Sequence, residues 1–127
     1  MIRKATTAKN LPSAGPYSHA VEGGGLLFLS GQTPFNPATG KLVDGDINKQ
    51  TVQCFENLSA VLKEAGLSFD DVVKINVFLT DMNDFSAMNE IYKTMFSSPY
   101  PARSTVEVSA LPLGAQIEIE LIAQIKK

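Results

Sequence analysis

The sequence has few of the residues that mark metalloproteins, disulfide-rich proteins or membrane proteins. Among 127 residues there is one cysteine (Cys54) and one histidine (His19), and there is no tryptophan. A single cysteine cannot form an internal disulfide, which favours a reducing compartment. One histidine and one cysteine do not by themselves make a metal site, so we expect no metal. No apolar run approaches the roughly 18 residues that a membrane-spanning helix requires.

An excess of positive charge is also lacking. Eleven Lys and Arg stand against 13 Asp and Glu, which gives a net charge of −2. The basic residues are otherwise scattered, with two adjacent pairs, Arg3-Lys4 and Lys126-Lys127, near the two ends of the chain. Phosphate binding depends on clustered Lys and Arg, so nucleic acid is disfavoured as a partner. The first residues have no apolar segment of the secretory type, and we expect a cytoplasmic protein with no membrane partner.

What the sequence does contain is the composition of a folded globular protein. The hydrophobic fraction is 44% and the charged fraction 19%. No repeat, low-complexity tract or shift in composition divides the chain. We therefore expect residues 1–127 to form a single domain with its own core.

Two segments have the apolar period of a helix. The first follows Asp46, a good N-cap, and runs to about Ala65, where Gly66 suits the C-terminal position of positive φ. Its apolar stripe consists of Ile47, Thr51, Cys54, Phe55, Leu58, Val61, Leu62 and Ala65. The second is predicted to be capped by Asn83 or Asp84 and to end near Phe96. Cys54 is interpreted as inert core.

The remaining periodic segments are typical of strands. They cover residues 2–7, 17–22, 26–30, 72–80, 104–108 and 116–125. Strands with two helices between them predict an α+β protein, in which both helices cover one face of a mixed sheet. In the last strand, Glu118 and Glu120 point away from the apolar face. That second face is either solvated or packed against another subunit, because Ile122 lies on it too.

Arg103 and Glu118 are the first candidates for chemistry. Arg103 lies between a proline-marked loop and an apolar strand, and its planar guanidinium matches a carboxylate in two-point fashion. The alternative is an ion pair with Glu107 or another carboxylate. Glu118 would have a raised pKa if another subunit covered its face, and could then activate a water. The alternative is a solvated strand glutamate.

Three further positions bear on a possible pocket or catalytic site. Tyr17 follows Gly15-Pro16, where an aromatic ring can line a pocket or cover the core. Gly31 ends a strand and either lets backbone approach a ligand or makes a tight bend. His19 lacks the sequence context of a nucleophile elbow, which argues against a Ser-His-Asp triad.

These segments together resemble the Rid/YjgF family of reactive-intermediate deaminases, also named L-PSP endoribonuclease-like. The resemblance covers nearly the whole chain and rests on the joint order of several motifs. They include Gly15-Pro16-Tyr17-Ser18, Leu29-Ser30-Gly31-Gln32-Thr33-Pro34, Pro101-Ala102-Arg103-Ser104 and Ile117-Glu118-Ile119-Glu120.

The resemblance implies a chorismate-mutase-like fold and a homotrimer with a central β-barrel and intersubunit active sites. It implies hydrolysis of enamines and imines, such as 2-aminoacrylate, to 2-keto acids and ammonia without a cofactor. Arg103 would hold the substrate carboxylate, and Glu118 would orient the attacking water. Tyr17, Gly31 and Thr105 would line the substrate pocket.

Two departures from the family pattern bear on substrate range. Thr105 stands where the family often has cysteine, which excludes a thiol-based role. His19 stands where glutamine is frequent, and is expected to alter the polarity and pH response of the pocket. Two other functions remain open: a non-catalytic binder of 2-keto acids, and an RNA-cleaving or translation-inhibiting protein, which the acidic pI of about 5.3 disfavours.

Overall fold

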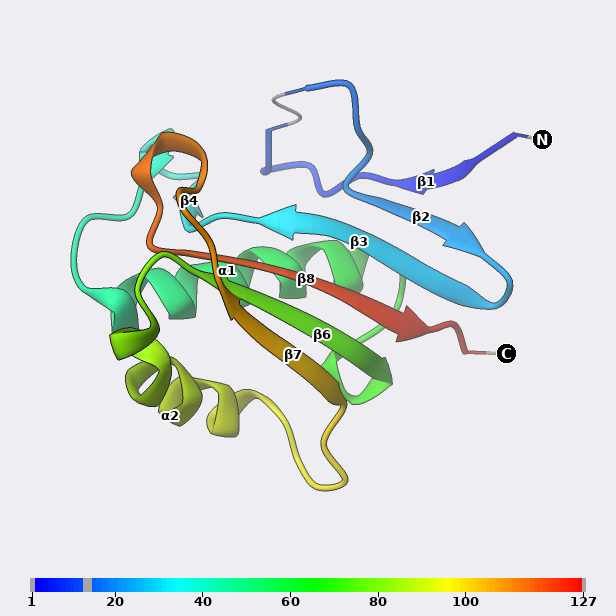
Figure 1. Ribbon diagram of the computed structural model, residues 1–127. Coiled ribbons are helices and arrows are strands. Elements are labelled where there is room, and N and C mark those ends of the chain that lie inside the picture. Colours follow the sequence, from blue (N-terminus) through cyan, green and yellow to red (C-terminus); the bar gives the residue numbers. More distant parts are fainter. Residues whose placement is uncertain (1, 13–14, 127) are drawn as a thin grey trace.

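The two α-helices and the strands of the main sheet follow one another in the order that the sequence predicts (Figure 1), whereas the sequence does not predict the short strand pair at residues 35–42. The computed structural model describes residues 2–12 and 15–126. The strands are β1 Lys4–Thr6, β2 Ala20–Gly23, β3 Leu26–Gln32, β4 Phe35–Asn36, β5 Lys41–Leu42, β6 Val72–Leu79, β7 Ala102–Glu107 and β8 Ile117–Gln124, and the helices are α1 Ile47–Glu64 and α2 Phe85–Met95. The prediction of an α+β protein with two helices and a mixed sheet is confirmed.

Helix α1 begins and ends at the predicted residues. The Asp46 carboxylate accepts a hydrogen bond from the backbone N–H of Lys49 at 3.1 Å, a cap that stabilises a helix by about 1 kcal/mol. Gly66, just beyond the helix, has a φ of +75°. The predicted apolar stripe is buried except for Ala65, which is partly buried. None of the helices in the described ranges is long and apolar enough to cross a membrane.

The main sheet has six strands in the order β1-β2-β3-β8-β6-β7. All neighbours are antiparallel except β6 and β7. These two are parallel because α2 carries the chain back between them, as a parallel pair requires. Strand β7 comes last in the strand order, so it lies at an edge of the sheet. It is next to α2, which its Arg103 contacts.

The helices lie on one side of the sheet, behind it in Figure 1. Residues of β6 and β8 facing the helices, such as Ile75 and Leu121, form the core with α1. The opposite side has no covering element among the described residues and is partly apolar. Phe28 and Val106 there are each 45% exposed, and Ile122 is partly buried.

The elements before β2 and α2 differ from the prediction. Strand β2 begins at Ala20, so Tyr17 lies in a loop and not in a strand. Asp84 occupies the predicted N-cap position of α2, but its side chain makes no capping hydrogen bond. The Asp81 carboxylate instead accepts from the N–H of Asn83 and caps a short 3-10 turn, Met82–Asp84, that leads into α2. The sequence missed this turn because a single 3-10 turn is too short to show a periodicity.

Candidate active site

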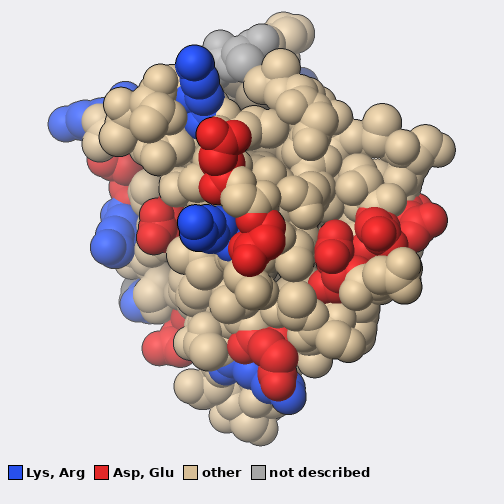
Figure 2. Space-filling model, turned by 90° about the vertical axis from the view of Figure 1, so that its left-hand side faces the viewer, with Lys and Arg blue, Asp and Glu red and all other residues tan. Residues whose placement is uncertain are grey.

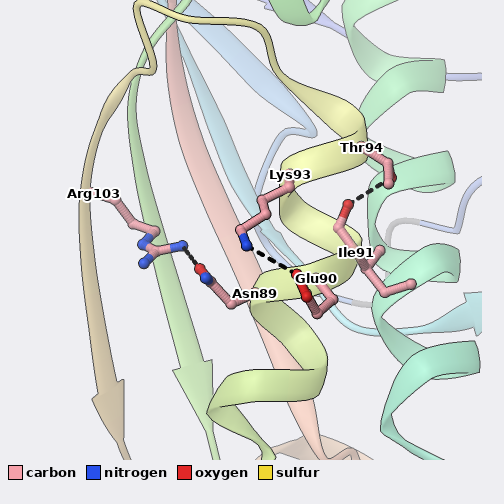
Figure 3. Close-up of polar contacts among 6 residues, drawn as sticks. All are labelled: Asn89, Glu90, Ile91, Lys93, Thr94 and Arg103. Atoms are coloured by element: carbon pink, nitrogen blue, oxygen red, sulfur yellow. Dashed lines mark hydrogen bonds and ion pairs between the residues drawn. The ribbon is translucent and has the colours of Figure 1, made fainter.

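Arg103 projects from β7 towards α2, as Figure 3 shows. Its Nη1 donates to Asn89 Oδ1 at 2.7 Å. The guanidinium carbon lies 4.5 Å from the ring centroid of Tyr92 and 5.5 Å from that of Phe85. One hydrogen bond and two aromatic faces thus fix the orientation of the guanidinium, since cation–π contacts favour a cation over the ring.

A cavity of about 360 Å³ lies beside this guanidinium. It is lined by Asn89, Tyr92, Lys93, Tyr100, Pro101 and Arg103. Lys93 pairs with Glu90 at 3.1 Å on the outer side of α2 (Figure 3). The cavity is therefore cationic and aromatic, a combination suited to a small carboxylate with an unsaturated body.

Within the described part of the chain, Arg103 forms no ion pair with Glu107. Glu107 Oε1 instead accepts from the backbone N–H of Met82 at 2.7 Å. None of the ion pairs between described residues includes Arg103. A guanidinium has five N–H donors, so Arg103 retains donors for a ligand after bonding Asn89.

Thr105 lies on the same face of β7 as Arg103, two residues further on. It pairs with Val77 of β6, whose side chain faces the core. The hydroxyls of Thr105 and Tyr92 are buried and have no hydrogen-bond partner in the part of the chain described. Burial raises the pKa of Tyr92, although the charge of Arg103 acts in the opposite direction. An unpaired buried hydroxyl costs about 1–3 kcal/mol. Both hydroxyls would therefore gain from a hydrogen bond to a polar ligand or to a second chain.

Glu118 projects from β8 on the opposite, uncovered face. It lines a second cavity, of about 590 Å³, together with Tyr17, Ser30, Gly31, Leu113 and Glu120. The side chain is partly buried. Burial, and to a lesser extent the charge of Glu120, raises the pKa of Glu118 from its ordinary value. A carboxyl group with such a pKa is better suited to accept and return a proton than a fully solvated one.

Gly31 leaves the space that the carboxyl group of Glu118 occupies. A Cβ at residue 31 would meet Oε2 of Glu118 and lie 2.9 Å from its Cδ. The glycine therefore allows the side chain of Glu118 to approach the backbone closely. The strand also bends here, as the alternative interpretation of Gly31 has it: the pairing of β3 with β8 shifts register at a β-bulge between Leu29 and Gln32.

We expect Gly31→Ala to keep the fold and to displace the carboxyl group of Glu118, since the obstructing atoms are the end of a flexible side chain. If Glu118 positions a reacting water, turnover should fall about 10- to 100-fold with little change in melting temperature. Steady-state rates and thermal melts would measure the two effects. Full activity in Gly31→Ala would show that the position of this carboxyl group is unimportant.

Tyr17 and His19 belong to the same loop but face different surroundings. Tyr17 is 47% exposed and lines the cavity of Glu118. His19 is buried: its Nδ1 accepts from the N–H of Ala8 at 3.0 Å, and its Nε2 lies 2.9 Å from the carbonyl oxygen of Pro12. His19 therefore lines neither of these two cavities of the single chain, and its ring fastens the loop from inside.

Arg103 and Glu118 do not meet within one chain. Arg103 pairs with Ile75 on the helix-facing side, whereas Glu118 pairs with Phe78 on the uncovered side. Strand β6 lies between β7 and β8. Successive residues of a strand point to opposite faces, so the two side chains end on opposite sides of the sheet.

Cys54 is a core residue, as the sequence suggests. It is fully buried, and its Sγ lies 3.3 Å from the carbonyl oxygen of Gln32. Burial, with a smaller contribution from Glu118, raises the pKa of this thiol well above its usual value, so the reactive thiolate is disfavoured. Within the described ranges no three His, Cys, Asp or Glu side chains are grouped as a metal would require.

Asn89 and Tyr92 were missed as candidate site residues. The sequence did contain a signal, which is the spacing of these residues. Asn89 follows Phe85 by four residues and precedes Tyr92 by three, so the three side chains share one face of the helix, and β7 meets that face.

The fold and the two cavities define a class: an α+β protein whose mixed sheet is covered on one face and whose arginine is oriented by aromatic rings towards a small cavity. Comparison with known proteins is consistent with this. The chain belongs to the YjgF/RidA family: its residues 7–125 match the family described as Endoribonuclease L-PSP.

Three relatives illustrate the similarity. A 2-iminobutanoate/2-iminopropanoate deaminase from Mus musculus is 46% identical over 124 residues, which is 97% of this chain and 92% of that protein. The crystal structure of a Rid family protein from Yersinia pestis has a TM-score of 0.93 and 51% identity, covering 98% of this chain and all of that one. The structure of E. coli TdcF with bound serine has a TM-score of 0.89 and 41% identity, covering 97% and 99% of the two chains.

Proposed function

We propose that this protein hydrolyses the imine and enamine forms of small 2-amino acids to 2-keto acids and ammonia. The observation that carries the proposal is Arg103, whose guanidinium is held by Asn89 and Tyr92 at the wall of a small cavity and keeps donors for a carboxylate. Mammalian relatives of 44–46% identity are named 2-iminobutanoate/2-iminopropanoate deaminases. The serine bound to E. coli TdcF is a ligand of the same class, a small amino acid with a carboxylate.

The active site of this proposal is built from two chains of a homotrimer. Arg103 and Glu118 lie on opposite faces of one sheet, so a single chain cannot place both on one substrate. The uncovered face carries exposed Phe28 and Val106, and β7 is an edge strand. Association that covers this face would bury apolar area and bring the Arg103 cavity of one chain to the Glu118 cavity of the next.

The reaction divides between the two halves of the site. Arg103 binds the substrate carboxylate, and Thr105 and Tyr92 offer hydroxyls beside it. Water attacks the imine carbon as the C=N π electrons move to nitrogen, and Glu118 takes a proton from that water. That proton passes to nitrogen, which gives a carbinolamine. The hydroxyl proton of the carbinolamine then passes to nitrogen through Glu118, the C–N bond breaks as the C=O bond forms, and ammonia and the keto acid are released. Such imines already hydrolyse in water, so orientation and proton transfer suffice and the reaction requires no cofactor.

Cleavage of RNA is a second candidate, because the matching family is described as Endoribonuclease L-PSP. The surface charge argues against it. On the face drawn in Figure 2, Lys and Arg side chains lie among Asp and Glu side chains and form no continuous basic surface. A non-catalytic binder of keto acids is the third candidate: it would need Arg103 but not Glu118.

The test is a coupled assay. A serine or threonine dehydratase generates the 2-amino-2-alkenoate in the cuvette, and the decay of the imine and the appearance of keto acid are followed with and without this protein. We expect the protein to accelerate decay severalfold or more. Unchanged decay with a keto acid still bound would favour the binder, and degradation of RNA dependent on Arg103 and Glu118 would favour the nuclease.

A further inference from the structure

Glu120 is a second carboxylate in the cavity of Glu118. It lies two residues along β8, on the same uncovered face and partly buried. It lines the cavity of about 590 Å³ together with Glu118 and also borders a smaller hollow of about 130 Å³. The mechanism outlined above gives this residue no role.

The carboxylate of Glu120 is fixed by a neighbouring strand. Asn76 pairs with Glu120 in the register of β6 with β8, and its Nδ2 donates to Oε2 at 3.0 Å. Asn76 is a partly buried amide on the uncovered face, where solvated side chains would otherwise be free to rotate. The pairing therefore holds a negative charge at a defined place one side-chain position from Glu118.

We infer that Glu120 is a positioning residue that strengthens Glu118 as the proton acceptor, with Asn76 holding it in place. This inference rests on the proposed function. A fixed negative charge beside a carboxyl group opposes the loss of its proton, and Glu120 is the second cause, after burial, of the raised pKa of Glu118. A stronger base takes the proton of the attacking water more readily, and the same group then returns that proton to nitrogen.

Other titratable or charged groups around Glu118 are few. The phenol of Tyr17 lines the same cavity from the N-terminal loop. From β6, Lys74 shares the uncovered face, where its Nζ donates to Ser104 of β7 at 3.2 Å. The buried thiol of Cys54 lies on the helix side, and the β3 residues Ser30, Gly31 and Gln32 bring no titratable group. Glu120 is thus the negative charge nearest in sequence and register to Glu118.

The test compares Glu120→Gln with wild type in two measurements. The first is the titration of the Glu118 carboxyl carbon, followed by NMR and assigned with Glu118→Gln. The second is the pH profile of kcat in the coupled assay. Loss of the neighbouring charge should move the inflection of Glu118 to lower pH, lower the plateau rate about ten-fold, and extend activity to more acidic pH.

Glu56→Gln is the matched control, because Glu56 is exposed on α1 and its loss removes the same charge from the helix side. It should change neither profile. Asn76→Ala keeps the charge of Glu120 but removes the hydrogen bond that fixes it. It should shift the inflection of Glu118 in the same direction by a smaller amount. This variant tests the inference even if Glu120→Gln does not fold. An active wild type with an unmoved Glu118 titration in both variants would overturn the inference. A wild type without turnover would instead overturn the proposed function.

Discussion

Arg103→Ala should lose at least about 100-fold in kcat/KM for imine hydrolysis, because the substrate carboxylate then has no fixed anchor and its imine carbon is no longer held against the water. Arg103→Lys should recover part of the loss, mainly in KM. Lysine restores the charge, but not the planar fork that Asn89 and Tyr92 orient in the wild type. The coupled assay measures both variants.

The matched control is Arg3→Ala, since Arg3 is the other arginine of the chain and is exposed. It should behave as wild type. Arg103→Ala should also keep its melting temperature within a few degrees, because its polar bond is to one amide and its ring contacts lie at the edge of α2. Wild-type turnover in Arg103→Ala would remove the carboxylate anchor from the mechanism.

Mixing two inactive variants should restore activity. Arg103→Ala lacks one half of the proposed site and Glu118→Gln lacks the other, and each alone should turn over at about 1% of the wild-type rate or less. After subunits are exchanged at equal amounts, a site that joins an intact Arg103 to an intact Glu118 forms at about a quarter of the interfaces by random association. Turnover should therefore return to about a quarter of the wild-type rate.

The control for this experiment is the double variant Arg103→Ala/Glu118→Gln, which should stay inactive when mixed with either single variant. Light scattering on the same samples measures the assembly. Trimers that exchange subunits without any recovery of activity would show that the site lies within one chain. A monomer mass at micromolar concentration would contradict the shared site directly.

Much of the fold follows from local signals in the sequence. Asp46 and Gly66 bound α1 at the predicted residues, because an N-cap and a glycine of positive φ act over a single turn. The alternation of Ile117, Glu118 and Ile119 assigned each side chain of β8 to the correct face. Local sequence context singled out Arg103, Glu118, Tyr17 and Gly31 as candidates, and resemblance to a family added Thr105 and the roles of all five, which stay predictions.

The sequence could not give the surroundings of those residues. In β7, polar Arg103 and Thr105 alternate with Ala102, Ser104 and Val106, so neither face is uniformly apolar and hydrophobic periodicity does not reveal which face α2 covers. The role of His19 depends on Ala8 and Pro12, which fold around its ring only in the complete loop. The capping hydrogen bond before α2 is accepted by Asp81 and not by Asn83 or Asp84. Whether a side chain can cap depends on the backbone angles at its own residue, which the sequence does not show.

The sequence by itself therefore determined the class of fold, the ends of α1, the inward faces of the long strands and the scatter of Lys and Arg along the chain. These depend on local periodicity, capping and composition. The tertiary structure alone decided that Asn89 and Tyr92 orient Arg103, that Gly31 makes room for Glu118, and that Arg103 and Glu118 lie on opposite sides of one sheet. These depend on strand register and on contacts between residues distant in sequence, which no local pattern encodes.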